Sequence, residues 1–134
     1  LTAALVYPAD YGFIVETLAE DGDALDALLL ISEPTFPGCR VEVRPLAVLW
    51  MEDEHGPDPK LITALPSAAD YEGWADIGDL PRRTLDEIEH FFTVYKDLEE
   101  GSSARTHGYE GSRAAETLVT ECQERFLKAA ASGG

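Results

Sequence analysis

The 134-residue sequence is poor in positive charge. Ten Lys and Arg residues stand against 26 Asp and Glu residues, so the formal net charge is −16. A surface field of this sign repels polyanions, which argues against nucleic-acid binding through a basic face. The field favours cations, and a small anion would need a metal ion or a local Lys/Arg cluster to bind. Solubility or salt adaptation explains many of the acidic residues equally well.

The sequence also lacks the cysteine patterns of thiolate metal sites and disulfide-rich domains. The two cysteines, Cys39 and Cys122, lie far apart and show no CxxC or Cys/His ligand spacing. Two structural thiols are typical of a cytoplasmic protein. The given sequence shows no secretory signal and no apolar run of membrane length, so we expect no contact with a membrane.

The first two thirds of the sequence has the pattern of short β-strands. A turn-rich stretch at 7–12 precedes the short apolar run 13–15, and a later stretch alternates between apolar and polar residues until Pro45 interrupts it. The run that begins at Asp26 is apolar throughout, which indicates a strand buried on both faces. Several short strands at this spacing predict a small barrel. The expected strands are 26–31, 41–44, 46–51 and 60–65.

The last third of the sequence has helical periodicity. Thr84 and Glu87 have the spacing of a capping box, which predicts a helix start at Thr84 and a stop at Gly101. A second helix is expected over 112–130, and no linker divides the chain, so we expect a single domain over 1–134. The apolar stripe of the first helix comprises Leu85, Ile88, Phe92, Tyr95 and Leu98, and that of the second Ala115, Leu118, Val119, Cys122 and Phe126.

Three carboxylates crowd the entrance to the first apolar strand. Asp21, Asp23 and Asp26 lie within six residues, and like charges this close repel unless a cation or water separates them. Gly22 permits a tight turn that could fold all three towards one space. Hard divalent cations prefer such oxygen ligands. An EF-hand is not expected, because Leu25 occupies the third ligand position of that template.

A second acidic loop precedes the strand at 60–65. Asp53 and Asp58 flank a Gly-Pro turn, and Lys60 follows them. Two acidic loops at strand ends of one barrel can converge on one mouth, where five carboxylates would repel strongly unless metal ions lay among them. Such a site suits phosphoryl chemistry, since metals neutralise phosphate oxygens and acidify water, and a spare carboxylate can take a proton. Each loop by itself is equally compatible with a solvated acidic turn.

A bound phosphate would also need cationic and hydroxyl partners. Tyr95 and Lys96 share the first helix, and Lys60 and Arg105 are further candidates, although each also fits an ordinary core or surface position. The histidines His55, His90 and His107 show no metal-ligand spacing and are interpreted as non-ligands.

Six motifs occur in an order that resembles a known family. They are YPADYGF, EDGDALDALLL, EPTFPG, MEDEHGPDPK, DIGDLP and HFFTVYKDLEEG. Together they closely resemble the soluble, Mg²⁺-dependent inorganic pyrophosphatases of family I, bacterial type. The resemblance implies a small OB-like five-stranded β-barrel with two packed C-terminal helices, an α+β fold rich in β structure. It also implies hydrolysis of pyrophosphate to two phosphates, and a homohexamer.

The resemblance also implies roles for individual residues. Asp21, Asp26 and Asp58 match the ligands of two activating Mg²⁺ ions, for which Mn²⁺ or Zn²⁺ could substitute, with Asp26 bridging them. Asp23 matches the residue that orients or deprotonates the attacking water, and Asp53 matches a ligand for metal that arrives with the substrate. The matched substrate-phosphate contacts are Tyr11, Lys60, Tyr95 and Lys96.

The sequence departs from the family pattern at three places. Ala24 stands where the signature has Pro, which would stiffen the metal loop, and Ser102 stands where Lys is common. The family also has a preceding segment that supplies barrel strand and three charged site residues, so the N-terminal strands are missing from this chain and we expect residues before Leu1 in the native protein. The alternative is a catalytically inactive relative that binds metal or phosphate as a subunit.

Overall fold

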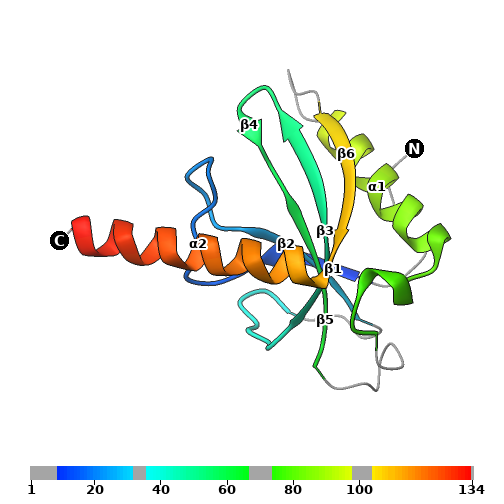
Figure 1. The fold of residues 1–134 in the computed structure, drawn as a ribbon, viewed down its shortest axis with the longest axis horizontal. Coiled ribbons are helices and arrows are strands. Elements are labelled where there is room, and N and C mark those ends of the chain that lie inside the picture. The colour runs from blue at the N-terminus through cyan, green and yellow to red at the C-terminus, as the bar shows by residue number, and fades with distance from the viewer. Residues whose placement is uncertain (1–8, 32–35, 67–73, 98–103, 134) are drawn as a thin grey trace.

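The strands and helices follow the chain in an order that places most strands first (Figure 1). The computed structural model describes residues 9–31, 36–66, 74–97 and 104–133. Its elements are β1 (Ala9–Phe13), β2 (Asp26–Leu30), β3 (Arg44–Asp53), β4 (Gly56–Pro57), β5 (Lys60–Ala64), the 3₁₀ helix η1 (Ile77–Asp79), α1 (Arg82–Asp97), β6 (Ala104–Gly111) and α2 (Ser112–Ser132).

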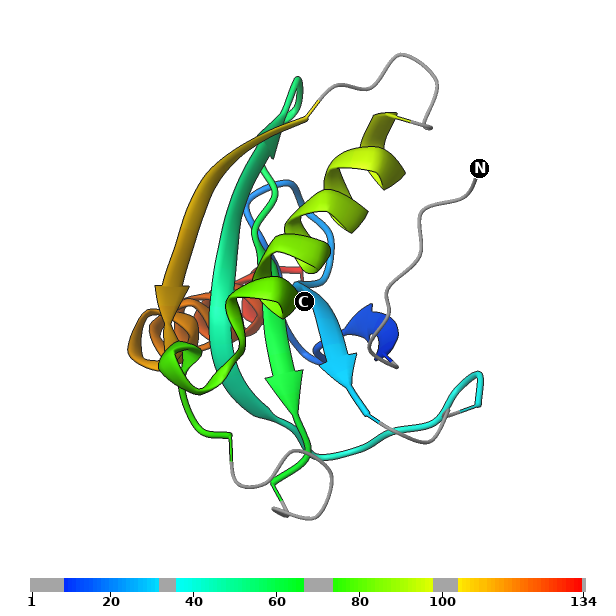
Figure 2. The same cartoon turned by 90° about the vertical axis from the view of Figure 1, so that its right-hand side faces the viewer.

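The strands form one mixed, six-stranded sheet in the order β1-β2-β5-β3-β4, with β6 also paired to β3. β2 and β5 are parallel neighbours, and the other pairs are antiparallel. Figure 2 shows that β3 and β6 curve strongly around α1. In the described part of the chain the sheet stays open, and its curvature is compatible with the expected OB-like barrel.

The two helices cover opposite faces of the sheet (Figures 1 and 2). Ile88 and Phe92 of α1 pack with Leu28 and Ile62 in one core cluster. Ala115 and Cys122 of α2 belong to a second cluster with Leu61 and Val48. Successive residues of β2, β3 and β5 therefore enter different cores, which explains why these strands are apolar throughout and confirms that the run beginning at Asp26 is buried on both faces.

The main differences from the expected elements lie in the sheet. Residues 41–43 are not part of a strand, and β3 instead begins at Arg44 and continues through Pro45. A register shift between Pro45 and Ala47 accommodates the proline, which cannot donate a ladder hydrogen bond. The stretch 7–12, expected to be a turn, contributes most of β1, and residues 7 and 8 lie outside the described ranges.

The predicted capping box at the start of the first helix is wrong. α1 begins at Arg82, and the buried hydroxyl of Thr84 has no hydrogen-bond partner in the described chain. Pro81 precedes the helix, and its carbonyl accepts a hydrogen bond from the Thr84 backbone N–H, so the helix starts two residues earlier than expected. The apolar stripe is confirmed at Ile88 and Phe92, whereas Leu98 and Gly101 lie outside the described residues.

Candidate active site

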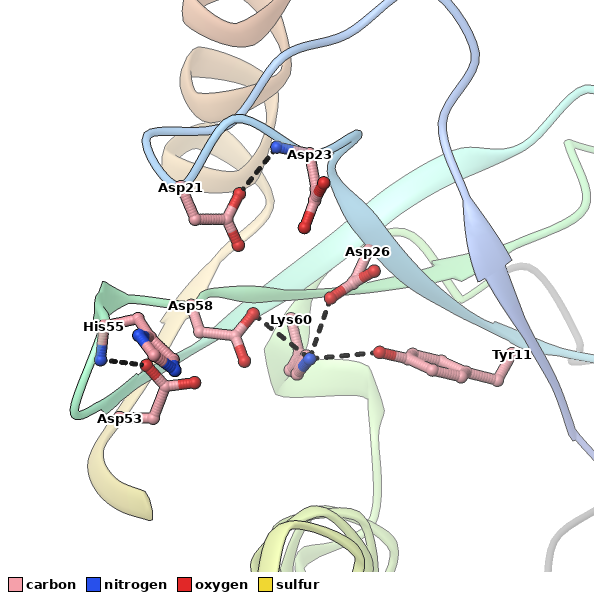
Figure 3. A network of polar contacts seen from close by, with 8 residues as sticks. All are labelled: Tyr11, Asp21, Asp23, Asp26, Asp53, His55, Asp58 and Lys60. Carbon is pink, nitrogen blue, oxygen red and sulfur yellow. Dashed lines mark hydrogen bonds and ion pairs between the residues drawn. The ribbon is translucent and has the colours of Figure 1, made fainter. Parts of the chain in front are cut away.

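The two acidic loops meet at one open pocket of about 360 Å³ (Figure 3). Parallel pairing brings them together, because Ala27 of β2 is in register with Leu61 of β5. Both strands therefore begin at the same edge of the sheet, and the acidic segments that precede them face each other there. This convergence was predicted from the sequence and is confirmed. The lining residues are Asp21, Asp23, Asp26, Asp53, His55 and Asp58.

In each loop an aspartate carboxylate accepts a hydrogen bond from the backbone N–H of the residue two positions later. Asp21 Oδ1 accepts from the Asp23 N–H at 2.9 Å, and Asp53 Oδ1 accepts from the His55 N–H at 2.8 Å. Gly22 has φ +92° in the first loop, a conformation that side chains with a Cβ rarely adopt. These turns hold the carboxylates at the pocket without requiring the proline that Ala24 replaces.

Lys60 is the cation that lies among these carboxylates. Its residue is 1% exposed, and its Nζ donates hydrogen bonds to Asp26 Oδ2 at 2.8 Å, Tyr11 Oη at 3.0 Å and Asp58 Oδ1 at 3.2 Å. Burial alone lowers the pKa of Lys60, but the hydrogen bonds to Asp26 and Tyr11, with the charge of Asp58, outweigh burial and raise it. Lys60 is therefore a permanent positive charge bound to two carboxylates that line the acidic pocket.

Tyr11 reaches this site from β1. Its hydroxyl accepts the hydrogen bond from Lys60, and burial raises the pKa of the phenol to about 12, against a lowering effect of Lys60. The hydroxyl is therefore neutral at physiological pH and remains able to donate a hydrogen bond. Packing alone does not explain this tyrosine, because its hydroxyl is hydrogen-bonded to Lys60.

Other candidates are placed differently. The backbone of Tyr95 and Lys96 lies in α1, and their side chains are outside what the structure describes. Arg105 is exposed on β6, where its guanidinium lies 3.5 Å from Glu52 Oε1, and it does not line the pocket. His55, in contrast, does line the pocket. Its position depends on the β3–β4 turn, and the sequence carried no ligand spacing that would have identified it.

The donor set of the pocket fits a hard divalent cation. Its lining consists of five carboxylates and one imidazole, and carboxylate oxygens are the ligands that Mg²⁺ prefers. Among the described residues, no three such groups are already close enough together to hold a metal ion. Asp26 and Asp58 are instead bonded to Lys60.

Comparison with known proteins identifies the family of the chain. A family model described as inorganic pyrophosphatase matches residues 1–127. The chain belongs to the inorganic pyrophosphatase family. Its similarity to this pyrophosphatase family extends over nearly every described element, and both acidic loops fall within it.

Curated pyrophosphatases and solved pyrophosphatase structures are similar over most of the chain. The inorganic pyrophosphatase of Leifsonia xyli subsp. xyli is 46% identical over 119 residues, which are 89% of this chain and 73% of the relative. That of Haloferax volcanii is 40% identical over 120 residues, 90% of this chain and 68% of the relative. The Helicobacter pylori pyrophosphatase structure has a TM-score of 0.83 at 40% identity, covering 90% of this chain and 72% of its own.

The Thermus thermophilus pyrophosphatase structure also has a TM-score of 0.83, at 44% identity, and covers 88% of this chain and 69% of its own. These likenesses confirm the expected β-rich, OB-like fold class with two packed helices, but in the described residues the sheet has six strands and is open, where a closed five-stranded barrel was expected. They also confirm the pyrophosphatase resemblance, which rested on six short motifs.

Proposed function

We propose that this chain hydrolyses inorganic pyrophosphate to two phosphates, with Mg²⁺ as its cofactor. The observation that carries the proposal is a pocket lined by five carboxylates, two of which bind the buried Lys60, in a chain of the pyrophosphatase family. No feature of the described residues or of the comparisons favours a catalytically inactive subunit.

The metal ligands we assign are Asp21, Asp26, Asp53 and Asp58, all of which line the pocket. Mg²⁺ bound there supplies neutralisation of the phosphate oxygens and lowers the pKa of a water molecule. Mn²⁺ or Zn²⁺ could substitute, because both bind carboxylate oxygens. A cation is required on electrostatic grounds as well, since pyrophosphate must approach a chain of net charge −16.

Asp23 is assigned as the catalytic residue that orients the attacking water and takes its proton. It lines the pocket, and within the described ranges its carboxylate makes no hydrogen bond or ion pair to other side chains. Its oxygens are therefore available to accept a proton, whereas those of Asp26 and Asp58 are directed at Lys60.

The proposed contacts to substrate phosphate are Tyr11, Lys60, Tyr95 and Lys96. Lys60 supports this role because its charge is bound to two carboxylates that line the pocket, and the Tyr11 hydroxyl lies 3.0 Å from its Nζ. Tyr95 and Lys96 are proposed from the family resemblance, and they belong to α1, the helix whose Phe92 ring lies against Lys60. A lysine and a tyrosine hydroxyl beside the pocket carboxylates suit an anion that binds together with cations.

Three further proposals rest on the family and the composition. We propose a single domain over 1–134 and assembly into a homohexamer, which size-exclusion chromatography with light scattering would measure. A cytoplasmic location is supported by two cysteines that are both free thiols. Among the described residues, no helix is long and apolar enough to cross a membrane.

Phosphate release from pyrophosphate tests the proposal. The purified full chain should release phosphate with Mg²⁺ and stop when EDTA is added. Asp23→Asn should lower the rate by about 100-fold or more, the usual contribution of a general base, with an unchanged circular dichroism spectrum. Glu124→Gln, an equal charge change on exposed α2, should leave the rate unchanged. A wild-type chain that binds Mg²⁺ or phosphate without turnover would show an inactive binding subunit instead.

A further inference from the structure

The ammonium group of Lys60 contacts two aromatic side chains as well as two carboxylates. Its Nζ lies over the Phe92 ring at 5.4 Å from the centroid, and it meets Tyr11 at the hydroxyl, 3.0 Å from Oη and 5.5 Å from the ring centroid. The two rings contact each other edge to face, with centroids 5.5 Å apart and planes at 61°. Tyr11 and Phe92 therefore form an aromatic clamp, by which we mean the Tyr11 hydroxyl and the Phe92 ring, which contact the Lys60 ammonium from two sides.

Phe92 supplies the rigid half of this clamp. It is fully buried in the core between α1 and the sheet, with an exposed fraction of 0%. The ring of Phe91 supports it from the side, with centroids 5.2 Å apart and planes at 74°. Tyr11 is by contrast 41% exposed and lies on β1, at one end of the sheet order. A fully packed ring holds its position better than a half-exposed one.

The clamp addresses a weakness of lysine as a phosphate-binding group. The Lys60 side chain is a flexible four-carbon stem that ends in a compact charge, so hydrogen bonds alone leave it several positions. A ring face attracts the ammonium from the apolar side, and at a desolvated site this attraction is worth about tenfold in an equilibrium or more. A leucine at this position would fill similar space without attracting the charge.

We propose that Phe92 is a positioning residue of the active site, whose ring holds the Lys60 ammonium where it meets substrate phosphate. The proposal rests on the proposed pyrophosphatase function and deepens it. Phe92 also lies three and four residues before Tyr95 and Lys96 on α1, so the same packed ring fixes the part of the helix that carries the other assigned phosphate contacts.

The test compares two substitutions of Phe92 with a control in the same cluster. Phe92→Met conserves much of the buried volume but removes the ring face, and Phe92→Tyr retains a ring. Ile88→Val removes a methyl group from the same core cluster and takes no ring away from Lys60. Each variant is measured by pyrophosphate kinetics with Mg²⁺ and by NMR of the lysine side chains without added divalent cations. The chain has three lysines, Lys60, Lys96 and Lys128, which simplifies the spectrum.

The ring contact should shift the Lys60 ε-methylene resonances upfield of those of exposed Lys128 and give a nuclear Overhauser effect to the Phe92 ring. Phe92→Met should move these resonances towards those of Lys128 and raise the KM for pyrophosphate about tenfold, with kcat changed less than KM. In Phe92→Tyr and in Ile88→Val, the Lys60 resonances and the KM for pyrophosphate should stay close to their wild-type values.

Two results would overturn the proposal. One is a Phe92→Met variant in which neither the Lys60 resonances nor the KM change, and the other is an equal change in Ile88→Val, which would mark a general packing effect. If Phe92→Met does not fold, the wild type alone decides the question. A nuclear Overhauser effect between the Lys60 ε-methylene group and the Phe92 ring would support the contact, and its absence would refute it. A wild type without phosphate release would refute the proposed function, whereas the NMR result would still decide the clamp.

Discussion

Replacing Lys60 with methionine removes the one buried cation from among the pocket carboxylates of the described chain. The substitution deletes three hydrogen bonds of 2.8, 3.0 and 3.2 Å and removes the ammonium that Asp26 and Asp58 share. Methionine fills much of the same volume, so the effect is electrostatic rather than a packing loss.

The expected loss of stability follows from the burial of the partners. Removing one member of a buried ion pair costs about 3–5 kcal/mol, because the remaining charge is left uncompensated. The Asp58 side chain is 10% exposed, but that of Asp26 is 34% exposed and can be rehydrated. We therefore expect Lys60→Met to lower the free energy of unfolding by about 3 kcal/mol, near the lower limit of that range. For a chain of this length that corresponds to a fall in Tm of about 10 °C.

Urea denaturation at pH 7 in EDTA, followed by circular dichroism, measures this loss. Lys128→Met, an exposed change on α2, is the control and should stay within about 0.5 kcal/mol of wild type. Mg²⁺ should restore more stability to Lys60→Met than to wild type, because a cation then replaces the missing ammonium. A Lys60→Met variant as stable as Lys128→Met would refute the reasoning that Lys60 compensates the pocket charge.

Two further predictions concern the pH dependence of stability and the role of Asp76 at the start of η1. Lys60 and Tyr11 both have raised pKa values, so they hold their protons to higher pH when folded than when unfolded. Their contribution to the free energy of unfolding is complete below about pH 10 and is lost as pH rises towards 12 and beyond. The free energy of unfolding should therefore fall over this range. The fall should be less steep in Tyr11→Phe. Asp76 accepts hydrogen bonds from the backbone N–H groups of Ser112 and Ile77, which lower its pKa. Asp76→Ala should lower the urea midpoint at pH 7, and the difference from wild type should vanish as pH falls below 3.8 through the folded pKa. Equal midpoints at pH 7 would show that this cap contributes nothing.

The parts of the fold that could be predicted are those set by local pattern. The apolar runs that became β2 and β5 are buried on both faces, and α2 begins at Ser112 as expected and extends two residues past its expected end. β6 was missed, because its sequence ARTHGYEG has neither an apolar run nor β-branched alternation, and its pairing with β3 stabilises it. The prediction of a capping box at Thr84 was wrong because the helix begins earlier, directly after Pro81.

The residues that make up the site could be predicted from the sequence, whereas most contacts between them could not. Charge crowding alone indicated that Asp21, Asp23, Asp26, Asp53 and Asp58 share a pocket, and parallel pairing of β2 with β5 places them there. The sequence could not show that Lys60 is buried between Asp26 and Asp58, because this depends on the register of the two strands. Nor could it show that Phe92, a core residue by its helical spacing, contacts that ammonium.

Calorimetric titration with Mg²⁺ tests most directly whether the crowded carboxylates form a cation site. Wild type should show saturable binding, and Asp21→Asn should weaken it about tenfold or more while keeping the oxygen that accepts the Asp23 N–H. Glu124→Gln carries the same change in net charge on exposed α2 and should bind as wild type does. Equal binding in Asp21→Asn and wild type, or no saturable binding in either, would contradict the account.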